Sequence, residues 1–197
     1  MAARCVGLLV VGLLMASLWQ FNHAAYIYAK AWLAQVLIEN AWEKTLNNEG
    51  APQKPWGWAD TWPVARLQIF YRNREMQTLY VLKGSAGNSL AFGPGHLSGS
   101  TTPGRLGTVI IGAHRDTHFR HMAKLKVSDL IRMQAANGEW RQYRFDTSEV
   151  VDVSKEDVAL DSNTDQLILV TCYPFNGLLP SGTLRWLGRA VPDGNPI

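Results

Sequence analysis

The thiol of Cys172 is the side chain with the clearest potential for covalent chemistry in this sequence. An apolar run, residues 167–170, leads into it, and Tyr173-Pro174 follows. The run predicts a buried strand, because it is short and is bounded by polar residues and by proline. Cys172 would then lie where a rigid strand opens into a loop, which suits a reactive group. The alternative is a buried, inert cysteine, since free cysteines are among the most buried residues.

Two further side chains would complete a reaction centre around this thiol. His114 follows the predicted strand at residues 108–111, and Arg185 lies in the last predicted strand. An imidazole can take the thiol proton, and an arginine can donate hydrogen bonds to an oxyanion. We expect the three residues to meet if their strands are neighbours. Alternatively, His114 is a hydrogen-bonded loop histidine, and Arg185 forms a surface ion pair with Asp116 or Asp161.

The histidine stretch also permits a metal-based interpretation. His114, Asp116, His118 and His121 place four potential ligands in one short segment. In an extended segment the first three would point the same way, and a catalytic Zn²⁺ usually has three protein ligands. A metal-dependent hydrolase using His114, Asp116 and His118 is therefore an alternative hypothesis. It leaves Cys172 without a role.

Short strands separated by turn signals dominate the chain after residue 56. This spacing is typical of an all-β barrel or sandwich. Helical periodicity is weak, with at most one or two turns at residues 121–130. Residues 84–107 are rich in Gly, Ser, Thr and Pro and predict a long irregular loop with a turn of helix at most. The strands are expected at residues 64–69, 77–82, 108–112, 140–145, 150–153, 166–171 and 183–191.

The N-terminal part of the chain is expected to be a transmembrane helix. Residues 5–29 contain no Asp, Glu, Lys or Arg. As a helix they would reach about 37 Å, enough to cross a hydrocarbon core of about 30 Å. A cleaved signal peptide is the alternative, because Met15-Ala16-Ser17 offers small residues near the apolar core. The expected segments are a flank at residues 1–4, a signal-anchor helix and its extension at 5–45, a polar linker at 46–55 and a globular domain at 56–197.

The orientation of this segment follows mainly from its short N-terminal flank. Arg4 precedes the apolar run and Lys30 and Lys44 follow it, so the charge contrast is small. A cytoplasmic N-terminus with an exported C-terminus is the simpler topology. We expect a single-pass protein of the cell (inner) membrane, with its globular domain on the periplasmic or extracellular side.

Composition excludes several classes of protein. A net charge of +3, without a dense Lys/Arg cluster, argues against a nucleic-acid partner. The apolar fraction of 47% and the charged fraction of 18% suit a globular domain with a membrane segment. Cys5 and Cys172 are the two cysteines, so a disulfide scaffold is excluded and Cys172 is expected to be a free thiol. We expect the globular domain to be a monomer.

Five motifs follow one another along the globular domain, at residues 62–67, 93–96, 112–117, 169–175 and 184–186. Their types and order resemble those of the sortases, the membrane-anchored cysteine transpeptidases. The run at residues 112–117 and the Tyr-Pro-Phe after Cys172 are most similar to the Gram-negative (class GN) sortases, with pilin-type and class D enzymes next. Ile168 stands where the family's cysteine motif carries a threonine, and Gly188 stands where a β-branched residue is usual.

The resemblance implies an eight-stranded sortase-type β-barrel with short helices. It implies Cys172 as nucleophile, His114 as general acid and base, and Arg185 as donor to the oxyanion and to the substrate backbone. Thr171 is expected to support the substrate site, and no metal or cofactor is expected. The implied substrate is a secreted protein with a C-terminal LPxTG-like sorting signal. Its acyl group would pass through a Cys172 thioester to an amine acceptor in the cell envelope.

A third hypothesis is a β-barrel domain without catalytic activity. A membrane-tethered β-barrel binding module with an incidental cysteine would show the same membrane segment and the same strands. It would form no covalent adduct with a sorting-signal peptide. Under the sortase interpretation we expect His96 and His118 to be structural or loop residues, whereas the metal-based one makes His118 a ligand.

Overall fold

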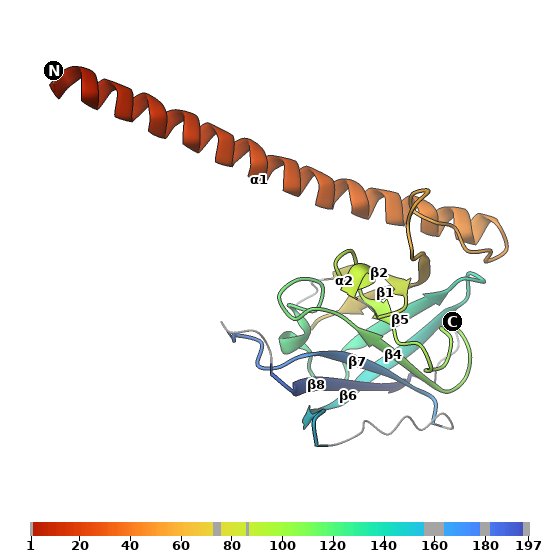
Figure 1. Cartoon of the computed structure of the whole chain (residues 1–197). Helices are drawn as coiled ribbons and strands as arrows, with labels where there is room; N and C mark the ends of the chain where they lie inside the picture. Colours follow the sequence, from red (N-terminus) through yellow and green to blue (C-terminus); the bar gives the residue numbers. More distant parts are fainter. Residues whose placement is uncertain (1, 73–75, 86, 156–163, 178–181, 195–197) are drawn as a thin grey trace. The chain divides into compact units, whose positions relative to one another are not determined.

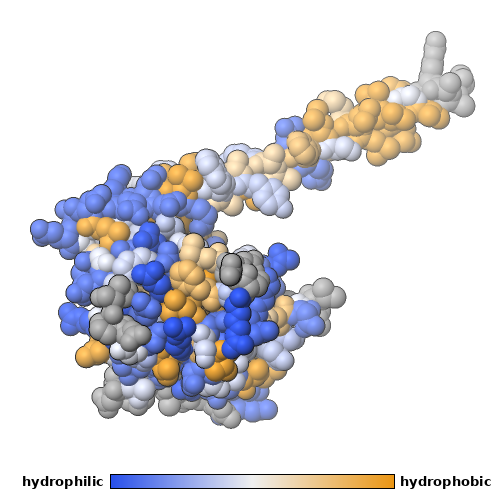
Figure 2. Space-filling model, turned by 180° about the vertical axis from the view of Figure 1, so that it is seen from behind, coloured by the Kyte–Doolittle hydropathy of each residue, from blue (hydrophilic) through white to orange (hydrophobic). Residues whose placement is uncertain are grey.

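A long helix, α1 (Ala2–Asn47), precedes the strands in a computed structural model of the chain, which describes residues 2–72, 76–85, 87–155, 164–177 and 182–194. Residue contacts divide the chain into two units, Met1–Leu37 and Ile38–Ile197. In the first unit the large apolar side chains of α1 are exposed, and Figure 2 shows them as an orange band. By length and composition this helix can cross a membrane, as the charge-free run predicted.

The last turns of α1 belong to the second unit. Ile38, Ala41 and Trp42 are buried there, and the Trp42 indole Nε1 donates a long hydrogen bond (3.4 Å) to Gln134 Oε1. Glu43 forms an ion pair with Arg66 at 3.7 Å. Residues 38–45, which the sequence analysis assigned to the extension of the membrane helix, therefore pack onto the strands.

The second unit is a closed barrel of eight strands in the order β1-β2-β3-β4-β7-β8-β6-β5 (Figure 1). This confirms the predicted all-β, eight-stranded fold. Two short helices, α2 (Gly87–Leu90) and η1 (Met122–Lys124), lie in the connections. The strands are β1 (Pro63–Phe70), β2 (Met76–Lys83), β3 (Gly95–His96), β4 (Thr108–Gly112), β5 (Leu130–Ala135), β6 (Trp140–Asp152), β7 (Gln166–Cys172) and β8 (Leu184–Pro192).

Strand prediction was correct near the expected site and less complete elsewhere. The predicted strand at residues 108–112 coincides with β4, and the one at 166–171 falls within β7. Two expected strands, 140–145 and 150–153, are halves of the single strand β6. The polar residues between them pair with β8 after a β-bulge at Phe145/Thr147. β3 and β5 were not predicted.

The barrel has an inner and an outer apolar layer beside β4 and β7. Val109, Ile111 and Leu169 point into the main core. Ile110 and Ile168 belong to a second buried cluster. Because successive side chains of a strand alternate between faces, this second cluster marks the outer face of the barrel wall.

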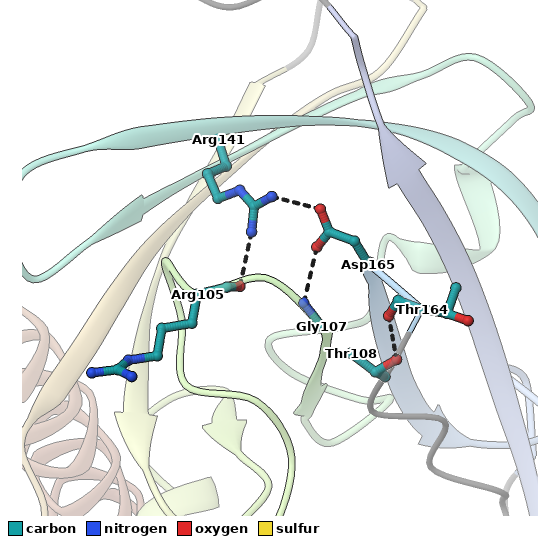
Figure 3. A network of polar contacts seen from close by, with 6 residues as sticks. All are labelled: Arg105, Gly107, Thr108, Arg141, Thr164 and Asp165. Carbon is teal, nitrogen blue, oxygen red and sulfur yellow. Dashed lines mark hydrogen bonds and ion pairs between the residues drawn. The ribbon is translucent and has the colours of Figure 1, made fainter.

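Polar contacts hold the starts of β4 and β7 in register (Figure 3). The Arg141 guanidinium donates to Asp165 Oδ2 at 2.6 Å and to the Arg105 carbonyl at 2.8 Å. The same carboxylate accepts from the Gly107 amide through Oδ1 at 3.3 Å. Thr108 Oγ1 donates to the Thr164 carbonyl at 2.9 Å. These contacts lie beside the first pair of the β4–β7 ladder, Thr108 with Gln166, and so help to fix which residues meet at its other end.

Candidate active site

Cys172 and Arg185 face each other across two antiparallel strands. Cys172 is the last residue of β7, and its Cα is the register partner of the Cα of Arg185 in β8. Directly opposed residues in an antiparallel pair put their side chains on the same face, close enough to interact. The Tyr173 amide continues the ladder by donating to the Leu184 carbonyl at 3.1 Å. Strand pairing thus brings together two of the three predicted catalytic residues.

His114 lies at the corresponding end of β4, the strand on the other side of β7. β4 and β7 are parallel, with Gly112 opposite Val170, and the Ala113 amide donates to the Val170 carbonyl at 3.1 Å. Two more steps along each strand lead to His114 and Cys172. The pattern of alternation assigns both positions to the outer face that carries Ile110 and Ile168. The structure therefore gathers His114, Cys172 and Arg185 at one end of three adjacent strands.

Thr171 lies on the opposite, inner side of β7. Its side chain is buried, and its hydroxyl donates to the Ala113 carbonyl at 2.7 Å. This bond ties the end of β7 to the residue that precedes His114. The predicted contribution of Thr171 to the substrate site is therefore indirect in this geometry, through the spacing of the two strand ends.

The Arg185 guanidinium is held by its own loop. Nη1 donates to the carbonyls of Gly182 at 2.8 Å and Leu184 at 2.9 Å. Neither expected alternative partner forms an ion pair with it in the described part of the chain: Asp116 pairs with Arg115, and Asp161 lies outside the described residues. These bonds leave the other guanidinium nitrogens as candidates for donation to a reacting group.

Arg115 is the residue of the site that sequence reasoning undervalued. In sequence it is the direct neighbour of His114, which makes it the obvious alternative to Arg185 as an oxyanion donor. The side chain is instead buried, with 6% exposure, and its guanidinium donates to the carbonyls of Pro174 and Gly177 at 2.8 Å each. A buried arginine aimed at backbone carbonyls of another loop leaves no signal in a single sequence.

The remaining histidines do not form a metal site with His114. Among the described residues, which include His114, Asp116, His118 and His121, no three His, Cys, Asp or Glu side chains converge to hold a metal ion. His118 is half-buried, and burial, followed by the positive charge of His114, lowers its pKa. The geometry therefore does not favour the metal-dependent hydrolase.

His96 has a structural environment, as expected. Its Nε2 lies 3.0 Å from the Thr101 carbonyl and 3.0 Å from Ser100 Oγ. Burial lowers its pKa, and the hydrogen bond to Thr101 opposes that shift. These contacts fold the connection between β3 and β4 onto itself.

An aromatic cluster supports the site from inside the barrel. Trp186, next to Arg185, stacks on Phe145 with ring centroids 6.2 Å apart and meets the edge of Phe175 at 5.6 Å. A methyl group at Gly188 would overlap the Trp186 indole. The departure from the usual β-branched residue at Gly188 is therefore matched by a tryptophan that needs the space.

Comparison with known proteins agrees with this geometry. A family model described as a sortase domain matches residues 73–193. Sortase D of Bacillus subtilis strain 168 is 34% identical over 101 residues, and the match spans 50% of each chain. The aligned part is thus about half the length of that relative.

Solved structures with the same barrel carry the sortase name as well. The Clostridium perfringens sortase D5 transpeptidase is 22% identical, covers 82% of this chain and 99% of its own, and has a TM-score of 0.61. Sortase A from Corynebacterium diphtheriae is 23% identical, covers 83% of this chain and 85% of its own, and has a TM-score of 0.59. At these identities the structures bear on the fold, while the family model covers more than half of the sequence. The chain belongs to the sortase family.

Proposed function

We propose that this sortase is a membrane-anchored transpeptidase that cleaves a C-terminal LPxTG-like sorting signal and transfers the acyl group to an amine. The observation that carries the proposal is the gathering of a thiol, an imidazole and a guanidinium at the ends of β4, β7 and β8. These are the three groups that thiol-based acyl transfer requires: nucleophile, proton carrier and oxyanion donor. No cofactor is needed for this chemistry.

In the acylation step, the Cys172 thiolate attacks the carbonyl carbon of the threonine in the sorting signal. The carbonyl π electrons move to oxygen, and Arg185 donates hydrogen bonds to the resulting oxyanion. The tetrahedral intermediate then collapses, and the bond to the glycine nitrogen breaks. Protonated His114 gives its proton to the departing amine. The products are a Cys172 thioester and a free C-terminal fragment.

Transfer reverses these roles. An acceptor amine attacks the thioester carbonyl, neutral His114 removes a proton from the attacking nitrogen, and the Cys172 thiolate leaves. A new amide bond joins the sorted protein to the acceptor. Because microscopic reversibility uses the same residues in both directions, one set of side chains serves both half-reactions.

We also propose the location and partners of the enzyme. The exposed apolar helix α1 supports a single-pass anchor in the cell (inner) membrane, with the barrel on the exported side. The partners would be a secreted protein that carries the sorting signal and an amine group of the cell envelope. Membership of the class GN branch stays a prediction from the run at residues 112–117, since the curated relative is a sortase D.

Mass spectrometry of the full chain in detergent tests the proposal. After incubation with an LPxTG-type peptide, we expect a mass increase equal to the acyl fragment, mapped to Cys172, with release of the C-terminal fragment. A thiol alkylator should abolish the adduct, and EDTA should leave it unchanged. Loss of peptide cleavage on chelation, with recovery on adding Zn²⁺, would support the metal-dependent hydrolase instead. A peptide that binds without adduct or cleavage would support the non-catalytic binding module.

A further inference from the structure

The Arg115 guanidinium is an unusual element of the site because it is both charged and buried. Its Nε lies 3.3 Å from Asp116 Oδ1, its Nη1 donates to the Pro174 carbonyl and its Nη2 donates to the Gly177 carbonyl. A buried charge is costly unless it is paired and hydrogen-bonded. The ion pair and the two carbonyls meet that requirement, so the guanidinium has a defined position between two loops.

The two carbonyls belong to opposite ends of one turn. The Gly177 amide donates to the Pro174 carbonyl at 3.3 Å, which closes the turn two residues after Cys172. Nη1 therefore contacts the start of the turn, and Nη2 contacts its end. A Cβ at Gly177 would lie 2.9 Å from Nη1. The turn has thus formed around the guanidinium at closer range than a side chain at residue 177 would permit.

Arg115 is also the direct neighbour of His114 in sequence. One side chain therefore spans from the residue after the candidate acid and base to the turn after the candidate nucleophile. Among the described residues, the hydrogen bond from the Ala113 amide to the Val170 carbonyl is the last backbone bond between the segment that carries His114 and the segment that carries Cys172. The guanidinium extends the connection between the two strand ends past the point where the ladder stops.

We propose that Arg115 is a positioning residue that holds His114 and Cys172 at their working separation by clamping the Pro174–Gly177 turn. The proposal rests on the proposed function, since it assigns His114 and Cys172 their catalytic parts. It also argues against Arg115 as the oxyanion donor, because the side chain is buried and both terminal nitrogens already donate to carbonyls of the turn. Lysine cannot replace it, because a single ammonium group does not reproduce the planar fork that reaches both carbonyls.

The first test compares Arg115→Lys with Arg120→Lys, an exposed arginine of the same loop, in the full chain in detergent. Single-turnover acylation by an LPxTG-type peptide is measured well below the thermal midpoint of each variant. We expect Arg115→Lys to slow acylation by roughly 10²-fold, the scale associated with about 1 Å of misplacement, with little change in peptide KM. Arg120→Lys should match the wild type.

The second test separates positioning from a merely structural role. If Arg115 acts by placing His114 against Cys172, its effect should vanish when the imidazole is absent. The double variant His114→Ala/Arg115→Lys should therefore acylate as slowly as His114→Ala alone. A further loss of roughly 10²-fold in the double variant would overturn the proposal, because an independent contribution multiplies the rate loss.

Gly177→Ala provides an independent variant should Arg115→Lys fail to fold. The added methyl group displaces the guanidinium without removing it, so we expect a smaller loss of acylation rate that is also absent in the His114→Ala background. Unchanged acylation in both Arg115→Lys and Gly177→Ala would overturn the positioning role alone. A wild-type enzyme that forms no acyl adduct would overturn the proposed function and this inference together.

Discussion

Two regions of the barrel unit differ sharply in how they use their side chains. At the ends of β4, β7 and β8, His114 is exposed and Cys172 and Arg185 are partly exposed, with their positions set by strand pairing. Where the last turns of α1 cover the strands, Ile38, Ala41 and Trp42 are buried. The first region has reactive groups and little apolar burial of its own. The second has apolar burial and no reactive group.

This difference separates chemistry from stability. Burial of a large apolar side chain contributes on the order of 1.5–3 kcal/mol, whereas exposed polar groups contribute little to folding. Substitutions of the candidate site residues should therefore remove activity and leave the free energy of unfolding nearly unchanged. Substitutions under the helix should do the reverse.

The largest expected effect is that of Cys172→Ala. Without the thiolate no thioester can form, so acyl-enzyme should be undetectable by mass spectrometry, while the thermal midpoint changes little. Cys5→Ala is the matched control and should acylate like the wild type. Residual acylation by Cys172→Ala would place the nucleophile elsewhere.

His114→Ala should retain a weak, slow acylation, and should lose the bell-shaped pH dependence of kcat/KM that a thiol and imidazole pair produces.

The next effect is on stability. Trp42→Ala should lower the free energy of unfolding by about 3–5 kcal/mol, because it leaves a cavity between the helix and the strands. Trp58→Ala provides the control, since Trp58 is 84% exposed, and should change stability by less than about 0.5 kcal/mol. Denaturant unfolding followed by circular dichroism measures both. At temperatures where Trp42→Ala stays folded, its kcat/KM should equal that of the wild type.

Arg185→Lys should have a somewhat smaller effect, confined to the reaction. Loss of one oxyanion donor typically lowers kcat by about 10²–10³-fold, or 2.7–4 kcal/mol, and lysine retains the charge without the guanidinium geometry. Arg189→Lys is the matched control for Arg185→Lys, because Arg189 lies on the same face of β8 as Arg185. It forms an ion pair with Glu149 at 2.7 Å. Arg189→Lys should cost at most about 1 kcal/mol of stability and no activity. Equal acylation rates for the two variants would remove Arg185 from the oxyanion site.

The smallest effect concerns acid stability. Burial and the charge of His114 lower the pKa of His118 from 6.5, so the folded state binds this proton less tightly than the unfolded state does. The contribution to stability is therefore present above pH 6.5 and is lost as pH falls through the range below it. Thermal midpoints measured between pH 7.5 and 5 should decline less in His118→Gln than in the wild type. Parallel declines would show that His118 is not the group responsible.

The sequence predicted strands β4 and β7 well because its signals there are local. β4 and β7 are short apolar runs buried on both faces, and a candidate site residue, His114 or Cys172, lies at or just after the end of each. Which strands become neighbours is not a local property. The resemblance to the sortases predicted which strands are neighbours. The structure then showed that Cys172 and Arg185 are directly opposed in β7 and β8.

The missed features all depend on tertiary context. β5 (Leu130–Ala135) has a sequence that suits a helix as well as a strand, and it is a strand because β1 and β6 pair with it on both sides. The polar residues between the halves of β6 suggested a turn, but β8 pairs with them, and Glu149 binds Arg189. The packing of Trp42 against the strands could not be predicted, because an apolar helix end has the same sequence pattern whether it contacts lipid or protein.

Trp42 and its neighbours also determine where this protein can be cut. The segment after α1 looks like an accessible linker in the sequence, yet Pro55 and Ala59 are buried, and a Cβ at Gly50 would lie 3.0 Å from the Ala136 carbonyl oxygen. A protease that cleaved between residues 47 and 56 would detach the helical cover and expose the apolar surface beneath Trp42. Cleavage before Ile38 would release a barrel that keeps its cover. With α1 as the proposed membrane anchor, a folded barrel unit is therefore expected to be released by a cut within the helix and not by a cut in the apparent linker.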